Sequence, residues 1–241
     1  MNITIVGAGR AGSSFTMAFR KVGHQVRLIH HDEVARPGAL GEPELVVLSV
    51  PDDAIATVAR EIPVSDAYVV AHIAGARGLA ELGAHVRVGF FHPLVALATP
   101  SAGAERLMGA LFSVGGDAVI GDVVASLHGR AVRLSDDERV LYHAAATVAA
   151  NHLVALLAHV EELASSVGLT LEDFLPLAQQ ALDDVSSLGV RRALTGPASR
   201  GDMATIDAHL EAISPTLRPA YVAMANAAFE LAEARRLTSN V

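Results

Sequence analysis

The feature that most constrains this chain is a glycine-rich turn near its start, placed between a short apolar run and a helical pattern. Ile3-Thr4-Ile5-Val6 is typical of a buried strand, and Gly7-Ala8-Gly9-Arg10-Ala11-Gly12 follows it directly. In the pattern G-x-G-x-x-G, the first glycine permits a tight turn, the second lets the backbone approach a pyrophosphate, and the third lets helix pack on strand. We therefore expect Gly7 to Gly12 to bind a dinucleotide. The alternative is a turn with a structural role only.

The first part of the chain repeats this alternation of strand and helix. The turn opens a predicted helix from about Ala11 to Val22. Further strands are predicted at Gln25 to His30, Glu44 to Val50, Tyr68 to Ile73, Arg87 to Phe91 and Leu111 to Gly115. Strands that alternate with helices indicate right-handed βαβ units and a parallel sheet covered on both faces. The predicted class is α/β, with a doubly wound parallel sheet.

The pattern changes after Leu134. From Asp136 to about Val167 there is no Gly or Pro, and apolar residues recur at helical spacing. Further helices are predicted at Leu171 to Leu188, Met203 to Ile213 and Leu217 to Arg236. The sequence therefore predicts a dinucleotide-binding domain at 1–134 and an all-helical substrate and dimerisation domain at 135–241.

Composition removes several classes of function. The 18 basic and 26 acidic residues give a net charge of −8, which argues against a nucleic-acid partner. Because Cys is absent, there can be no disulfide, thiol nucleophile or thiolate metal site. Lys21 is the sole lysine and precedes every tyrosine, which excludes the Tyr-x-x-x-Lys pair of short-chain dehydrogenases. No apolar run reaches the ~18 residues of a membrane span, and no basic leader precedes the first strand, so we expect a cytoplasmic protein without a membrane partner.

The end of the second strand bears on the choice of dinucleotide. Enzymes that use NAD place an acid there, about 20 residues after the glycines, to bind the ribose 2′-hydroxyl. Here that position is His30, followed by His31 and then Asp32. Imidazoles can accept a 2′-phosphate, so we expect NADP to be preferred over NAD. The alternative is that both histidines are exposed loop residues and Asp32 contacts the ribose.

Other strand ends add to the expected cofactor crevice. The carboxyl ends of parallel strands face the ligand in doubly wound sheets. Ser49, Val50 and Pro51 end the third strand and are expected to lie along the cofactor. His72 and His92 end two neighbouring strands, and we expect them to contact nicotinamide or substrate. The alternative for both is a hydrogen-bonded turn histidine.

Several motifs together resemble one family. They are the glycine turn, Val50-Pro51-Asp52-Asp53-Ala54-Ile55, His72-Ile73-Ala74-Gly75, His92-Pro93-Leu94, Tyr142-His143-Ala144-Ala145, Ala150-Asn151, Leu194-Thr195-Gly196-Pro197 and Arg200-Gly201-Asp202. This set resembles the Rossmann-like proteins whose C-terminal half is called domain of unknown function 2520. Ala74 departs from the serine common in that family.

The resemblance implies a particular fold but supplies no substrate. It implies a fold similar to ketopantoate reductase, pyrroline-carboxylate reductase and hydroxyisobutyrate dehydrogenase. In that fold the helical domain is like the C-terminal domain of 6-phosphogluconate dehydrogenase and commonly contacts a second subunit. We therefore expect a homodimer.

A reductase of this kind needs a proton donor beside the substrate. In the similar hydroxy-acid dehydrogenases a Lys and an Asn on the first long helix of the second domain serve this purpose. On the corresponding helix this chain offers His143, Thr147 and Asn151 at successive steps of four residues, which is one polar stripe. We expect His143 to be the general acid, Asn151 to orient the substrate, and Thr147 and His92 to complete the catalytic set. The alternative is a buried, hydrogen-bonded contact between domains.

A second polar island follows near the end of the chain. Arg200 is expected to bind a substrate carboxylate, while Asp202, Thr205 and His209 complete a substrate pocket. The alternative for Asp202 is an N-cap. No ligand spacing of a metal site is found, and we expect no metal. The sequence thus predicts an NADP(H)-dependent oxidoreductase acting on a small carbonyl or imine, with a ketopantoate-like 2-oxo acid as one candidate. A nucleotide-binding sensor without turnover and a structural dimerisation module are the alternatives.

Overall fold

The fold was analysed in a computed structural model, which describes the backbone of residues 1–239 and the side chains of residues 1–237. The chain divides into two compact units, Met1–Ala150 and Asn151–Val241. The strands end with β7 (Arg130–Arg133), and only helices follow in the described residues. The first of these helices, α5 (Asp136–Thr147), still belongs to the first compact unit. The predicted division at 134/135 stays a prediction.

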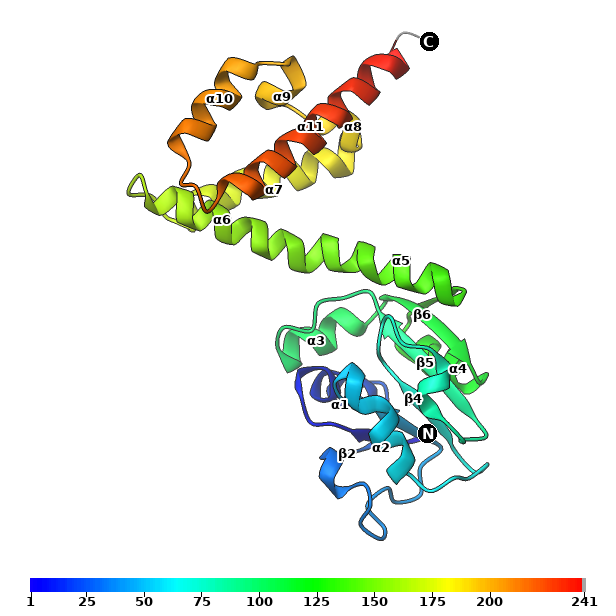
Figure 1. The fold of residues 1–241 in the computed structure, drawn as a ribbon. Coiled ribbons are helices and arrows are strands. Elements are labelled where there is room, and N and C mark those ends of the chain that lie inside the picture. The colour runs from blue at the N-terminus through cyan, green and yellow to red at the C-terminus, as the bar shows by residue number, and fades with distance from the viewer. Residues whose placement is uncertain (240–241) are drawn as a thin grey trace. The chain divides into compact units, whose positions relative to one another are not determined.

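The first unit contains one seven-stranded sheet (Figure 1). Its strands are β1 (Asn2–Val6), β2 (Gln25–Ile29), β3 (Leu45–Leu48), β4 (Val69–His72), β5 (Val88–Pro93), β6 (Leu111–Gly116) and β7. The spatial order is β2-β1-β3-β4-β5-β6-β7. The first five strands are parallel, and the order reverses beside β1, so the carboxyl ends of β1 and β3 flank the crevice that doubly wound folds use for ligands.

Helices cover both faces of this sheet. They are α1 (Arg10–Lys21), α2 (Ile55–Glu61), α3 (Pro100–Leu107), α4 (Val119–Ser126) and α5. Phe15 and Phe19 of α1 pack with Phe91 of β5 in one core, to which α3 and α4 also contribute. A second core lies on the opposite face, where Ile55 and Val58 of α2 pack. The predicted α/β class with a helical C-terminal part is confirmed.

The sheet differs from the prediction at one edge. β6 runs antiparallel to β5, and β7, which the sequence pattern did not predict, pairs parallel to β6. β7 was missed because Arg130 and Arg133 flank only two apolar residues, so neither alternation nor a continuous apolar run is visible. The reversal places the end of β5 beside the start of β6.

Helix α5 packs on the β5–β6 part of the sheet. The Arg139 guanidinium lies 4.6 Å from the centre of the Phe90 ring. One helical turn later, Tyr142 and His143 contact His92, two residues further along β5. One helical turn and two strand residues both advance by roughly 5–7 Å, so α5 and β5 stay in step. This matching brings His143 to the carboxyl end of β5.

The second unit is entirely helical within its described residues. Its helices are α6 (Leu153–Ser165), α7 (Leu171–Leu188), α8 (Val190–Ala193), α9 (Gly196–Arg200), α10 (Met203–Ala212) and α11 (Arg218–Ser239). Thr170 begins α7 with a capping box completed by Asp173, and Gly189 ends it with a φ of 78°. A π-helical turn at Val148–His152 joins α5 to α6.

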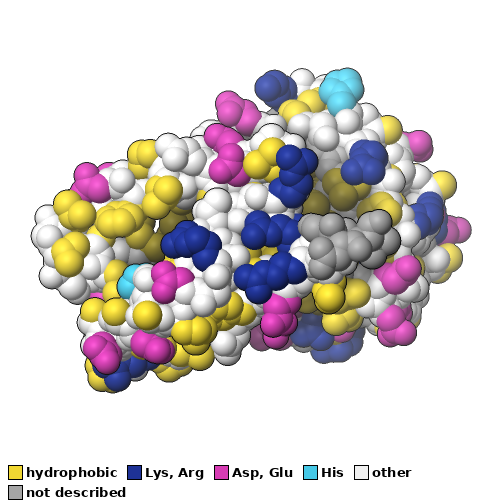
Figure 2. All heavy atoms as spheres, turned by 90° about the horizontal axis from the view of Figure 1, so that it is seen from above, with side chains coloured by type: hydrophobic (Ala, Val, Ile, Leu, Met, Phe, Trp, Pro, Cys, Tyr) yellow, Lys and Arg dark blue, Asp and Glu magenta, His cyan; other side chains and the backbone are white. Residues whose placement is uncertain are grey.

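The helical run Asp136–Ser165 is long and apolar enough to cross a membrane by length and composition, and none of its most apolar window is buried. Exposed apolar side chains are frequent in the second unit, and Figure 2 shows such side chains in yellow on the face it displays.

Candidate functional site: a glycine loop and a pair of imidazoles

The glycine loop connects β1 to α1, and two of its glycines are required by close packing. Gly7 has a φ of +111°, and a Cβ there would lie 2.2 Å from the carbonyl oxygen of Ser49. A Cβ on Gly12 would lie 1.9 Å from the carbonyl oxygen of Gly7. These two positions therefore hold the turn against β3 and the helix against the turn.

Gly9 is glycine for a different reason. Its φ of −70° is accessible to any residue, and a Cβ there would meet no atom within 4 Å. It is the N-cap of α1, and its lack of a side chain leaves the first amides of the helix uncovered. The first turn of α1 contains no acid. Open space at exposed helix amides is what a phosphate group would need.

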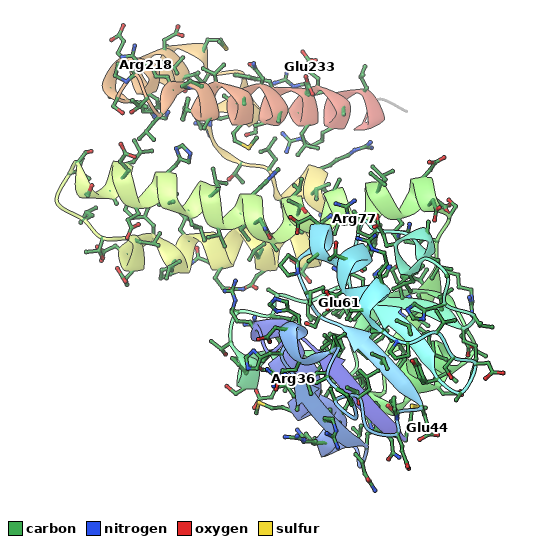
Figure 3. All side chains as sticks on the ribbon, turned by 60° about the horizontal axis from the view of Figure 1, so that its bottom comes forward. Arg36, Glu44, Glu61, Arg77, Arg218 and Glu233 are labelled. Carbon is green, nitrogen blue, oxygen red and sulfur yellow. The ribbon has the colours of Figure 1, made fainter. Side chains whose placement is uncertain are left out.

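The turn after β2 contains the two predicted histidines and an acid that the prediction did not include. His30 and His31 are exposed. The Glu33 carboxylate accepts a hydrogen bond of 2.8 Å from the backbone N–H of His30 and pairs with Arg36 at 3.1 Å. Figure 3 labels Arg36. Glu33 lies three residues after His30, which is the spacing of a capping box and could have been found in the sequence.

A cavity of about 250 Å³ opens at the carboxyl ends of the strands. It is lined by Ala11, Ser49, Val50, Asp52, Ile73, Ala74, Gly75, His92 and His143. The structure thus brings the glycine loop, the end of β3 and two of the predicted catalytic histidines together within the first unit. Pro51 is the next residue after Val50 and caps the short turn that leads into α2.

The two imidazoles of this cavity meet over Gly75. The rings of His92 and His143 lie 5.5 Å apart between centroids. A Cβ on Gly75 would lie 2.1 Å from His143 Cδ2, 2.9 Å from His143 Nε2 and 3.0 Å from His92 Nε2. Both ε nitrogens therefore lie next to Gly75, and only glycine leaves room for the two rings. Burial, followed by the charges of His143 and His72, lowers the pKa of His92 to about 4.

His72 is fully buried and uses both ring nitrogens within the protein. Its Nδ1 accepts a hydrogen bond from the backbone N–H of Ala74 at 3.2 Å, and its Nε2 lies 3.2 Å from the carbonyl oxygen of Gly78. Burial lowers its pKa. The imidazole holds the loop 73–78, so its predicted role toward a cofactor would act through the position of that loop.

The remaining predicted residues are distributed over α5 and the second unit. Thr147 is one turn after His143 on α5, whereas Asn151 lies in the π-helical turn and belongs to the second unit. The α-helical geometry in which steps of four residues form one stripe does not apply through a π turn.

Within the second unit, the polar island forms local hydrogen bonds. Asp202 caps α10 by accepting from the backbone N–H and the hydroxyl of Thr205, and these bonds lower its pKa. His209 Nδ1 lies 2.6 Å from the Tyr221 hydroxyl, and Arg200 is exposed. Their predicted contacts with substrate remain predictions. Among the described residues, no group of three or more possible metal ligands is present.

Fold and site together define the class: a Rossmann-type α/β unit with an open glycine loop, followed by a helical unit. Residues 114–228 match the family described as Domain of unknown function (DUF2520), so the resemblance expected from the motifs is confirmed over that segment. No curated protein matches the sequence significantly.

Solved structures support the same class. A Bacteroides fragilis protein assigned as an NADP oxidoreductase is 20% identical with a TM-score of 0.79, over 95% of this chain and 98% of that one. Plasmodium falciparum pyrroline carboxylate reductase with NADP bound is 14% identical with a TM-score of 0.61, over 98% of each chain. An imine reductase of Aspergillus terreus in complex with NADPH4 and dibenz[c,e]azepine is 20% identical with a TM-score of 0.63, over 95% and 93%. At such identities the likeness establishes the fold.

Proposed function

We propose that this protein is an NADP(H)-dependent oxidoreductase that reduces a small carbonyl or imine compound. The observation that carries the proposal is the open space at Gly9, at the start of α1, together with two imidazoles that lie close together in the cavity at the strand ends. The reductases of similar fold that were solved with NADP or NADPH4 support this choice of cofactor.

The residues of the first unit fit a dinucleotide. The backbone of Gly7 to Gly12 would hold the pyrophosphate on the amides of α1. His30 and His31 are exposed beside the loop and would contact the 2′-phosphate, with Arg36 offsetting the charge of Glu33. Ser49 to Pro51 would lie along the nicotinamide half. When bound, NADPH would supply the hydride.

His143 would supply the proton. Its Nε2 faces the cavity above Gly75, where the oxygen or nitrogen of a bound substrate would develop negative charge or basicity. An imidazole suits the task because its charge changes near neutral pH. Thr147 and Asn151 would orient the substrate. If the substrate is a ketopantoate-like 2-oxo acid, Arg200 would bind its carboxylate, and Asp202, Thr205 and His209 would complete the substrate pocket.

Cofactor binding is tested at Gly9. Gly9→Ala is expected to fold with a stability change within about 1 kcal/mol, because the permissive φ and open space favour alanine while the N-cap position favours glycine. The same methyl should weaken NADPH binding at least tenfold in a calorimetric titration, since it occupies the space assigned to phosphate. Gly121→Ala, at an open position on α4, is the matched control and should leave binding unchanged. Equal NADPH affinity in Gly9→Ala and the wild type would contradict the assignment.

Turnover separates the enzyme from a sensor. Purified protein should oxidise NADPH in the presence of at least one member of a panel of 2-oxo acids, ketones and cyclic imines. Tight NADPH binding with no oxidation across the panel would favour a nucleotide-responsive binding protein. No binding of either nicotinamide nucleotide would leave the structural module as the remaining function.

We also propose that the protein is a cytoplasmic homodimer associated through its second unit. Support comes from an apolar groove of about 860 Å³ between α6 and α7. Leu153, Leu156, Leu157 and Val160 of α6 line it, together with Phe174, Leu175, Leu182 and Val185 of α7. A second copy would remove these side chains from water, as homodimer interfaces commonly do.

A further inference from the structure

The seam between α5 and the β5–β6 strands contains an unusual concentration of buried polar atoms. Five buried side-chain nitrogen or oxygen atoms among the described residues have no hydrogen-bond partner, and four of them lie in this seam. They are His92 Nδ1, Ser113 Oγ, Arg139 Nε and Tyr142 Oη. Since an unpaired buried polar group is destabilising, such a cluster needs a physical explanation.

Two of these residues, His92 and Ser113, lie on the sheet, and the other two, Arg139 and Tyr142, lie on α5. Ser113 is the antiparallel partner of His92 in the β5–β6 register, so both side chains project to the same side. Tyr142 stands edge-on to His92 with ring centroids 5.8 Å apart. Arg139 lies one turn earlier on the same helix, over Phe90. Two neighbouring strands and α5 therefore contribute the four residues of the seam.

His92 has one nitrogen on each side of this arrangement. Its Nε2 faces the cavity above Gly75, beside Nε2 of His143. Its Nδ1 is buried on the side of the seam. Ser113, paired with His92 across the strands, and Tyr142, edge-on to its ring, are neighbours of His92 that carry hydroxyl groups, and a hydroxyl can donate a hydrogen bond. No direct hydrogen bond joins these hydroxyls to Nδ1 of His92. A buried water, which commonly has two to four polar partners, would bridge them.

We propose that the hydroxyls of Tyr142 and Ser113, acting through bound water, donate to Nδ1 of His92 and thereby fix its neutral Nε2–H tautomer. His92 and His143 then both present an N–H to the same point in the cavity. Resting on the proposed function, this assigns His92 as an uncharged hydrogen-bond donor to the substrate oxygen or nitrogen, and Tyr142 and Ser113 as positioning residues.

In this arrangement the two imidazoles have different roles. The substrate atom receives its proton from Nε2 of His143, while the N–H of His92 donates a hydrogen bond and keeps its proton. Two preorganised donors aimed at one developing charge are the usual device for stabilising it. The low pKa of His92 keeps that ring neutral throughout the physiological range. The tautomer of the ring, and not its charge, therefore decides whether Nε2 carries a proton.

Nitrogen-15 NMR of the histidine rings tests the proposal without any substrate. In the wild-type protein, His92 should show a protonated Nε2 and an unprotonated Nδ1 from pH 6 to 8. Tyr142→Phe combined with Ser113→Ala should shift the ratio toward the Nδ1–H form. A wild-type ring that is already Nδ1–H, or a double variant with an unchanged ratio, would overturn the proposal.

Matched variants separate this effect from loss of packing. Tyr68→Phe removes another largely buried tyrosine hydroxyl, one that donates to the carbonyl of Pro63. Ser126→Ala removes a serine that pairs with His24 at 2.8 Å. Neither should change the His92 spectrum.

Once a substrate is found, the double seam variant should lose about tenfold in kcat, as for one hydrogen bond, with NADPH affinity unchanged. The NMR result stands even if no substrate is found.

Discussion

Glycine and histidine residues line this site, and the glycines leave the space in which the histidines meet. Gly9 leaves room at the start of α1, and Gly75 leaves room for two imidazoles. Three histidines near the strand ends then take different roles according to their surroundings. His72 is saturated by backbone groups, His92 is buried and held neutral, and His143 reaches the cavity from α5.

His143→Gln tests the proton donor. Glutamine keeps a polar group of similar length but cannot transfer a proton, so kcat should fall by ~10²–10⁴, the usual contribution of a general acid. The dissociation constant of NADPH, measured by fluorescence titration, should stay within a factor of about two. Unchanged turnover would remove His143 from the mechanism.

His92 makes stability depend on pH in a defined direction. Its pKa is lowered from 6.5 to about 4 by burial and by the neighbouring His143 and His72. Between those values the unfolded chain binds more protons than the folded one, so stability is present above pH 6.5 and falls as the pH drops toward 4. The loss should approach about 3 kcal/mol. Urea unfolding at pH 7.0 and 4.5 measures this loss as the difference between the two free energies of unfolding. That difference should be smaller in His92→Gln than in the wild type, and it should be unchanged in His31→Gln, where the histidine is exposed.

At the scale of elements, the decisive contact is α5 against the loop that follows β4. Arg139 is only 3% exposed, stacks over Phe90 and pairs at 3.0 Å with Asp136, whose side chain is 87% exposed. A Cβ on Gly78 would lie 3.2 Å from Arg139 Nη2, and Gly75 contacts His143. The two glycines thus let the helix lie close to the loop.

Gly75→Ala tests this contact. The added methyl would lie 2.1 Å from His143 Cδ2, so the helix or the imidazole must move. We expect a loss of ~1–3 kcal/mol in the free energy of unfolding, as for other overpacked sites, and a loss of turnover. Gly121→Ala, which meets open space on a helix, should instead be neutral or stabilising by up to ~1 kcal/mol. Equal stability of the two variants would show that the contact between α5 and the loop after β4 accommodates an added methyl group.

At the scale of the whole molecule, the exposed apolar side chains of the second unit predict association. Leu156→Glu with Leu182→Glu places charges on both walls of the α6–α7 groove. Light scattering should report a dimer for the wild type and a monomer for this double variant. Met17→Glu, an exposed apolar position on α1 of the first unit, is the control and should remain dimeric. A monomeric wild type that sediments with lipid vesicles would indicate that the Asp136–Ser165 helix meets a membrane instead.

The sequence was informative wherever the cause of a structure is local. The strand, the glycine turn and the helix at residues 2–21 were predicted because tight turns and helix starts depend on neighbouring residues. The capping box of Ser135 and Glu138 at the start of α5 is another feature with a local cause. β7 was missed because its two apolar residues are recognisable as a strand only when β6 lies beside them.

The sequence by itself determined the α/β class, the glycine turn after the first strand, the exclusion of a Tyr-x-x-x-Lys pair and the absence of thiol chemistry, because each depends on residue identity or on short spacing. Only the tertiary structure decided which histidines meet. His92 and His143 are 51 positions apart in the sequence, and their ε nitrogens converge because α5 and β5 advance in step and Gly75 carries no side chain. Such convergence is a property of packing between distant segments, which no local pattern encodes.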